Sequence, residues 1–266
     1  MHEPEIPSAE NNILPDNAFT PEPSCPPSGP LGFGQQVAPW WHTIILVVIF
    51  VGMSALGGLG TKTKHLEGHQ VSTYIVTIVF EWILLAFVWW GLRMRHVRLG
   101  SLLGERYGGW AGFRRYLVYA GVFWIISYFF LTGSGLLLKF LHIGKAGPSE
   151  KALALAPTSP FQILLWFLVC ITAGICEEFI FRGYLLRQFS SLGGKVWIGV
   201  VLSSLVFGAS HGYEGLAPMI VIFAYGILFC LLLLKSKSLI PGMIAHAWQD
   251  IFAGLMLALL HHAHHL

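Results

Sequence analysis

The chain has 266 residues, of which 55% are hydrophobic and 11% are Asp, Glu, Lys or Arg. Soluble domains contain about 25% charged residues, so this composition excludes an ordinary soluble domain and predicts a membrane protein. The net charge of +3 is small. Because we attribute it to membrane topology rather than to a basic patch, we expect no nucleic acid partner.

Residues 1–41 differ from the rest of the chain. They contain five acidic side chains, nine prolines and no Lys or Arg. This composition is typical of disorder, so we predict an acidic, proline-rich tail on the cytoplasmic side. The segment lacks the basic start and early apolar run of a secretory signal, and the first span is therefore expected to direct the chain to the membrane.

Seven apolar runs follow, each near the length of about 20 residues that a membrane-spanning helix needs. We predict an all-α, polytopic integral membrane bundle of about seven transmembrane helices, and glycine interruptions leave room for an eighth. The predicted helices lie at roughly 43–60, 73–92, 116–138, 161–181, 196–211, 217–234 and 239–260. They form a transmembrane domain over residues 42–260, followed by a His-rich tail at 261–266.

Basic residues are divided unequally between the two sets of alternate loops. One set holds eleven Lys and Arg side chains and the other holds five. Because basic loops stay on the cytoplasmic side, this asymmetry predicts a cytoplasmic N-terminus and, with seven spans, a C-terminus on the opposite side. In a bacterial cell the membrane would be the plasma (inner) membrane.

Two adjacent glutamates occur in the apolar run at 161–181. A carboxylate at bilayer depth costs roughly 2.5 to 3.5 kcal/mol on insertion scales, so this pair indicates a function. Glu178 and Arg182 are four residues apart and share a helix face, where they can form an ion pair. Glu177 then points about 100 degrees away and stays free to titrate. The two glutamates are therefore expected to have different roles.

Two further polar groups follow in later apolar runs. His211 ends the run at 196–211, and His246 and Asp250 lie one helical turn apart in the last run. An aspartate at that spacing can orient the imidazole and fix its tautomer. Taken singly, His211 is more typical of a packing residue, and the His–Asp pair is equally typical of a bond between helices. Three such groups in one apolar third of the chain indicate a site.

The ordered set of motifs resembles a known family. Glu-Glu-x-x-x-Arg at 177–182, Phe-x-x-x-His at 207–211 and His-x-x-x-Asp at 246–250 are similar to the signature of the CPBP intramembrane protease family. This family is also called Abi and includes the type II CaaX prenyl endopeptidases. The similarity covers roughly residues 160–255. It implies a helix bundle around a polar cavity and peptide-bond hydrolysis within or near the membrane.

The resemblance also implies roles for the motif residues. Glu177 would be the general base that activates water, and the rest of its motif would support it. His211 and His246 would complete the site. Asp250 would take the last position of the third motif, where the family accepts Asn or Asp.

Two mechanisms stay open at this point. In the metal version, His211, His246 and one or two carboxylates bind zinc, which lowers the pKa of its bound water to about 7. In the metal-free version, Glu177 and a histidine activate water directly, and the third motif donates to the oxyanion. An ionised aspartate would repel an oxyanion, so Asp250 tilts the choice slightly toward a metal-binding or supporting role.

The expected depths of these residues disagree. At about 1.5 Å per residue, Glu177 lies near the inner end of its helix and His246 roughly 10 Å from the same side. His211 falls near the outer end of its helix if that helix starts at Lys195. For the three to meet, that helix must be tilted or short, or the predicted boundaries must be wrong by several residues. Glu81, alone in the second span, has no assigned role and faces either the cavity or another helix.

The leading hypothesis is an intramembrane endopeptidase that cleaves a membrane protein or lipidated peptide, such as a CaaX-like prenylated substrate or a peptide precursor. The lipid bilayer is the other expected partner. One alternative is a proton-coupled transporter, because intramembrane Glu, His and Arg also form proton relays. The other is a non-catalytic membrane scaffold of the same fold. The chain shows no internal repeat of the kind many transporters have.

Overall fold

The computed structural model describes residues 32–60, 69–143 and 153–264. In these ranges the secondary structure is helical, with one isolated bridge between Gly104 and Ser238 and no strand. The long helices are α1 (Trp40–Gly60), α2 (Gln70–Arg93), α3 (Gly109–Phe140), α5 (Pro160–Glu177), α7 (Val196–Ser210), α8 (Leu216–Ser236) and α9 (Ile240–His264). The predicted all-α bundle is confirmed.

Shorter helical elements complete the described chain. A π-helix, η3 (Glu178–Leu185), joins α5 to α6 (Leu186–Ser190), so that Pro160–Ser190 is one span of 31 residues. Two 3-10 helices, η2 (Leu99–Leu103) and η4 (Gly212–Glu214), lie in loops. Six helices are long and apolar enough to cross a membrane, and α7, with 15 residues, is a shorter seventh. The protein is an integral membrane protein.

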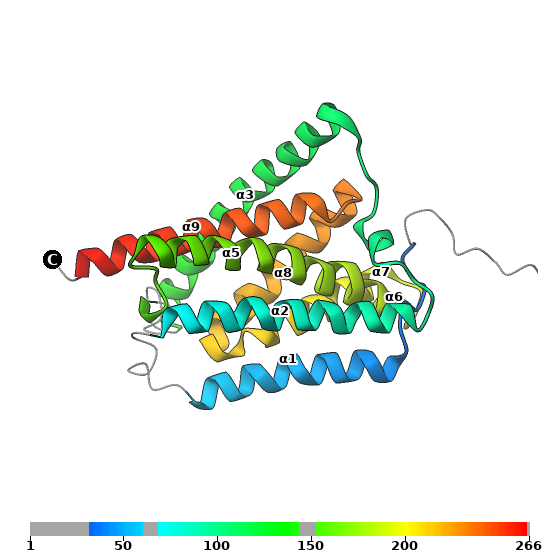
Figure 1. Cartoon of the computed structure of the whole chain (residues 1–266), viewed down its shortest axis with the longest axis horizontal. Coiled ribbons are helices and arrows are strands. Elements are labelled where there is room, and N and C mark those ends of the chain that lie inside the picture. Colours follow the sequence, from blue (N-terminus) through cyan, green and yellow to red (C-terminus); the bar gives the residue numbers. More distant parts are fainter. Residues whose placement is uncertain (1–31, 61–68, 144–152, 265–266) are drawn as a thin grey trace, which may run out of the picture.

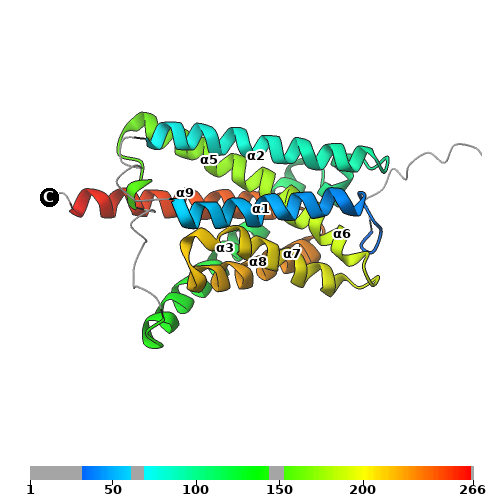
Figure 2. The ribbon, with the colours of Figure 1, turned by 90° about the horizontal axis from the view of Figure 1, so that it is seen from below.

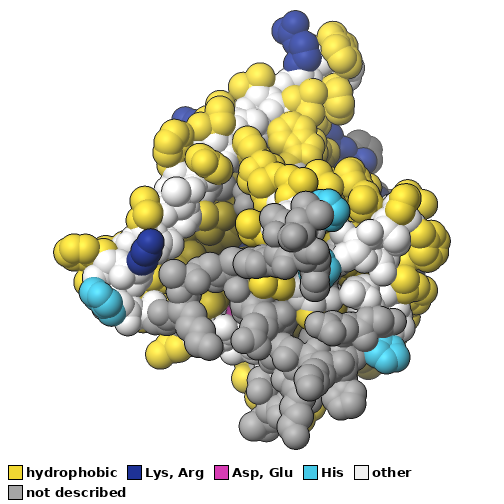
Figure 3. Space-filling model, turned by 90° about the vertical axis from the view of Figure 1, so that its left-hand side faces the viewer, with side chains coloured by type: hydrophobic (Ala, Val, Ile, Leu, Met, Phe, Trp, Pro, Cys, Tyr) yellow, Lys and Arg dark blue, Asp and Glu magenta, His cyan; other side chains and the backbone are white. Residues whose placement is uncertain are grey.

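Successive long helices alternate in direction between two ends of the bundle (Figures 1 and 2). The helix α1 begins at the right-hand end in Figure 1 and α9 finishes at the left-hand end, while α3 leans away from the others. In Figure 1, α2 and α8 end and α7 begins toward the right-hand end, and Arg93, Lys235 and Lys195 belong to these helix ends. Figure 3 views the other end, where hydrophobic side chains dominate around the grey residues and basic ones are scattered.

The bundle begins earlier than the predicted boundary at residue 42. Val37 and Ala38 are fully buried, and their backbone N–H groups donate to Gln188 Oε1 over 2.9 and 3.1 Å. The first helix starts at Trp40. At the other end of the chain, α9 continues to His264, through most of the predicted His-rich tail. Residues 1–31 of the predicted N-terminal tail and residues 265–266 lie outside the described ranges.

The helix predicted at 161–181 extends nine residues further, to Ser190. The hydropathy pattern predicts that the span ends before Arg182, because an arginine side chain is costly in lipid. In the folded bundle Arg182 is 1% exposed and paired with Glu178, and Arg187 donates to the Gly183 carbonyl over 2.8 Å. These partners compensate the charges, so the helix continues where the sequence pattern predicts an end.

Two glycines allow α5 and α9 to approach closely. A Cβ atom on Gly174 would lie 2.7 Å from the Met243 carbonyl oxygen, and one on Gly242 would lie 2.9 Å from Glu178 Oε2. Trp166 on α5 also donates its indole N–H to the Asp250 carbonyl on α9 over 3.2 Å. The small residues therefore place the polar side chains of α5 and α9 against one another.

Candidate active site

His246 lies at the centre of the polar cluster between α5 and α9. Its Nδ1 is 3.1 Å from Glu178 Oε1. On the other side of the ring, Nε2 is 3.7 Å from Glu177 Oε2 and 3.6 Å from Asp250 Oδ2. The expected spacing of His246 and Asp250 over one helical turn is thus realised as a contact. Both nitrogens of one imidazole face carboxylate oxygens.

The two adjacent glutamates differ in surroundings, as the sequence predicts. Glu178 pairs with Arg182 over 3.0 Å, and both side chains are 1% exposed. The Arg182 guanidinium carbon also lies 4.2 Å from the centre of the Phe207 ring and 4.7 Å from that of Phe229, which are favourable cation–π contacts. Glu177 is 20% exposed and has no basic partner apart from His246 among the described residues. It is the more accessible carboxylate.

The π-helix η3 begins at this point of the chain. Glu177 is the last residue of α5 and Glu178 is the first residue of η3. Single π-helical turns inside α-helices occur frequently at functional sites. Neighbouring residues on the helix still point in different directions, so the two carboxylates reach opposite sides of the His246 ring. Sequence spacing alone does not reveal this wider turn.

His211 joins the site because α7 is short. With 15 residues, α7 ends well before the length of a full span, and His211 follows it directly. The Phe207 ring lies between the two imidazoles, with its centroid 5.1 Å from that of His211 and 6.3 Å from that of His246. The shortness of α7 and the extension of the neighbouring span to Ser190, which places Glu177 deeper than predicted, together remove the conflict over depth.

The hydrogen bonds of His211 show which of its two ring nitrogens is left without a partner in the described structure. Its Nδ1 is 3.0 Å from the Phe207 carbonyl oxygen and 3.1 Å from Ser210 Oγ. A carbonyl oxygen only accepts, so Nδ1 carries the proton and the neutral ring keeps its lone pair at Nε2. No hydrogen-bond partner for Nε2 occurs in the described part of the chain. This nitrogen is available to a water molecule or a substrate.

Glu81 on α2 lies beside the cluster, although no role was predicted for it from the sequence. It is 9% exposed, and the charges of Glu177, His246 and Asp250 all act on it. One feature of the sequence could have identified Glu81 as a candidate site residue: it is the single Asp or Glu in its span. The helix α2 packs beside α5 in both views (Figures 1 and 2), which places Glu81 on the Glu177 side of the cluster.

The described residues do not fit the zinc site that one mechanism requires. Among them, no group of three or more His, Cys, Asp and Glu side chains is arranged to hold a metal ion. A histidine ligand needs a free lone pair directed at the metal. His211 keeps such a lone pair at Nε2 and His246 directs Nδ1 at Glu178, but no three described side chains converge on a common metal position. This geometry therefore does not support the metal-binding role that the sequence slightly favoured for Asp250.

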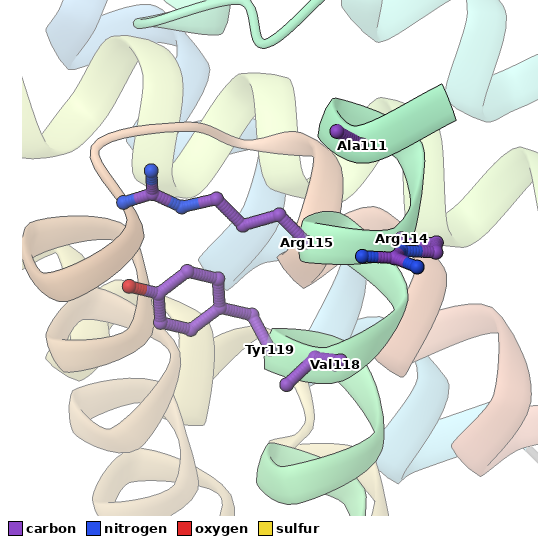
Figure 4. A pocket seen from close by; sticks show the side chains of 5 residues that line it. All are labelled: Ala111, Arg114, Arg115, Val118 and Tyr119. Atoms are coloured by element: carbon purple, nitrogen blue, oxygen red, sulfur yellow. The ribbon is translucent and has the colours of Figure 1, made fainter. Parts of the chain in front are cut away.

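A hollow on the outside of α3 lies apart from this cluster (Figure 4). It is lined by Ala111, Arg114, Arg115, Val118 and Tyr119. The Arg115 guanidinium carbon lies 4.1 Å from the centre of the Tyr107 ring, so it packs on the protein's own surface. None of the predicted site residues contributes to this hollow.

Comparison with curated proteins finds a protein that is similar to part of this chain. The chain is 30% identical over 132 residues to an uncharacterised 24.3 kDa protein of Escherichia coli, an alignment that covers 49% of this chain and 55% of that protein. The chain therefore spans about half the length of that curated relative. No solved structure matches the chain.

The family comparison covers the segment that holds the three motifs. Residues 159–252 match the family described as type II CAAX prenyl endopeptidase Rce1-like. This range contains α5 to α8 and half of α9, including all six predicted motif residues. At family level it supports an intramembrane protease of the CAAX type. The resemblance found in the sequence is confirmed by this match over residues 159–252.

Proposed function

We propose that the protein is an intramembrane endopeptidase in which Glu177 activates the water that attacks a peptide bond. The position of Glu177 carries the proposal. Its carboxylate is partly exposed, lies 3.7 Å from His246 Nε2, and has a buried Oε2 with no hydrogen-bond partner among the described residues. A carboxylate oxygen in this state can accept a proton from a water molecule.

The other side chains suit the remaining steps of hydrolysis. Attack by water produces a tetrahedral oxyanion, which positively charged or N–H donors stabilise. A protonated His246 can donate from Nε2, and His211 has Nε2 available to exchange a proton with the leaving amine. Asp250, 3.6 Å from His246 Nε2, orients that ring. The Glu178–Arg182 pair anchors the opposite nitrogen and so fixes the imidazole.

We further propose that the substrate is a membrane-associated protein or a lipidated peptide with a CaaX-like end. Two observations support a substrate held at the bilayer: the site lies between membrane-spanning helices, and the matched domain is described by its prenyl endopeptidase relatives. The N-terminus is proposed to be cytoplasmic, because the helix ends that carry Arg93, Lys195 and Lys235 lie toward the end where α1 begins (Figure 1).

The test is cleavage of a farnesylated CaaX reporter peptide by the full chain in lipid vesicles, read by mass spectrometry of both products. Glu177→Gln keeps the size of the side chain but removes the base. We expect a loss of about 10²- to 10⁴-fold in kcat, the usual contribution of general base catalysis. The same peptide without the farnesyl group reports whether the lipid is required.

A matched control is Glu105→Gln, which removes a carboxylate outside the site. Glu105 pairs with Lys237 over 3.4 Å and is 41% exposed. Its replacement should leave the cleavage rate unchanged. Equal rates for the wild type and Glu177→Gln would contradict the assignment of the base. Absence of any cleavage by folded wild-type protein would instead favour the scaffold, and flux of a solute without cleavage would favour a transporter.

A further inference from the structure

Glu81 is a buried carboxyl group whose charge has no cationic partner in the described chain. It lies midway along α2, and its Oε2 is buried without a hydrogen-bond partner. None of the ion pairs formed by the described residues involves it. A buried carboxylate without a partner is costly, whereas a protonated carboxyl group at the same position is much less so.

The neighbours of Glu81 place it against the proposed base. From α5, Glu177 acts on it, and so do His246 and Asp250 from α9. The charge of Glu81 in turn acts on the thiols of Cys170 and Cys176, both on α5. Glu81 therefore faces α5 and α9 rather than lipid.

A count of charges shows why one of these carboxyl groups keeps a proton. Four carboxyl groups, of Glu81, Glu177, Glu178 and Asp250, share the site with two cationic groups, Arg182 and His246. Full ionisation would leave two uncompensated negative charges in a low-dielectric interior, and like charges at close range disfavour one another. Glu178, Glu177 and Asp250 each contact a cationic side chain, but Glu81 does not.

We propose that Glu81 is a positioning residue that stays protonated and donates its O–H to Glu177, directly or through one water molecule. Two observations meet here, because Glu81 Oε2 and Glu177 Oε2 are both buried and both lack a hydrogen-bond partner among the described residues. Such a bond would keep the Glu177 carboxylate aimed at the attacking water. The proposal rests on the proposed function of Glu177 and gives α2, which lies outside the matched domain, a part in the site.

Three variants test this role. Glu81→Gln keeps a neutral side chain of the same size that can donate, whereas Glu81→Met removes the donor and Glu81→Asp keeps the acid but shortens it. We expect Gln to retain kcat within about threefold and Met to lose roughly tenfold in kcat with little change in KM, since a tenfold loss corresponds to about 1.4 kcal/mol, within the range of one good hydrogen bond. Glu105→Gln is the matched control and should match the wild type.

An infrared spectrum provides a readout that needs no substrate. The wild type should show the carbonyl band of a buried carboxylic acid, which Glu81→Gln and Glu81→Met lose and Glu177→Gln keeps. An acid band that persists in both Glu81→Gln and Glu81→Met would overturn the proposal. An equal loss of kcat in Glu81→Gln and Glu81→Met would also overturn it, because it would mean that a charge is required. So would full activity of Glu81→Met in a monodisperse, folded preparation.

The two proposals fail in different ways. If the wild type cleaves no peptide but the acid band is lost in Glu81→Gln, the protease assignment fails and the protonated Glu81 stands as a structural fact without the catalytic role. If the wild type cleaves and Glu177→Gln does not, but the Glu81 variants are indistinguishable from the wild type in rate and in spectrum, the base assignment stands and the role of Glu81 is wrong.

Discussion

Two polar clusters lie on either side of the π-helix η3, and they differ in how completely their atoms are paired. In the first, Tyr184 Oη contacts His42 Nδ1 at 3.0 Å and Thr43 Oγ1 at 2.8 Å, and His42 Nε2 lies 2.8 Å from the Phe87 carbonyl oxygen. None of these side-chain atoms is left without a partner in the described structure. This cluster joins α1, α2 and η3.

The second cluster, around His246, is incompletely paired. Oε2 of Glu81, Oε2 of Glu177 and both terminal nitrogens of Arg182 are buried without a geometrically satisfactory hydrogen bond. Native proteins rarely leave such atoms unpaired, and those that remain need an explanation. The comparison indicates that the first cluster fixes the helix in place, whereas the second keeps capacity for water and substrate.

The largest effect on stability is expected from breaking the ion pair at the second cluster. Arg182→Met leaves Glu178, which is 1% exposed, without its cation. Removing one partner of a buried pair typically costs about 3–5 kcal/mol. We expect a loss of this order in the free energy of unfolding, measured by denaturation in detergent micelles, together with loss of cleavage.

The matched variant for this prediction removes both charges. Glu178→Gln/Arg182→Met has no uncompensated carboxylate and should recover much of the lost stability, because replacing a whole buried pair is often close to neutral. It should not recover activity, since His246 Nδ1 loses the negative charge of the Glu178 carboxylate beside it. A double variant as unstable as Arg182→Met would show that packing against Phe207 and Phe229, rather than the charge, dominates.

A smaller effect, on stability alone, is expected at the first cluster. Tyr184→Phe removes the hydroxyl group that His42 and Thr43 both contact. Leaving these buried polar atoms unpaired costs about 1–3 kcal/mol. We expect the unfolding midpoint to fall while kcat of the folded enzyme stays within a few-fold of the wild type. A large fall in kcat at unchanged stability would mean that the two clusters are functionally joined.

The contrast between the clusters also shows what the sequence could predict. The pairs Glu178–Arg182 and His246–Asp250 depend only on spacing within one helix, and the structure contains both. Apolar runs likewise predicted the helices, because burial in lipid is a property of composition. The contact of Glu177 with His246 is different in kind, since it depends on how closely α5 approaches α9.

Three features could not be derived from local pattern. The π-helical turn after Glu177 leaves no mark in the hydropathy of the segment. The position of His211 depends on where α7 ends in depth, which is set by packing against other helices rather than by its own residues. Glu81 lies almost 100 positions before Glu177, so its membership in the site is visible only once α2 packs on α5.

Removal of divalent metal ions is expected to have the smallest effect and probes the second cluster most directly. If its unpaired atoms serve water and substrate, chelation should leave the cleavage rate unchanged, because no described set of ligands converges on a metal position. The measurement is metal content by mass spectrometry, with cleavage assayed before and after dialysis against a chelator.

The terminal histidines must be replaced first, since a His-rich end can bind metal on its own. One zinc per chain that is lost in His211→Ala/His246→Ala, with activity restored by zinc, would contradict the metal-free assignment. The unpaired carboxylate oxygens would then be ligands.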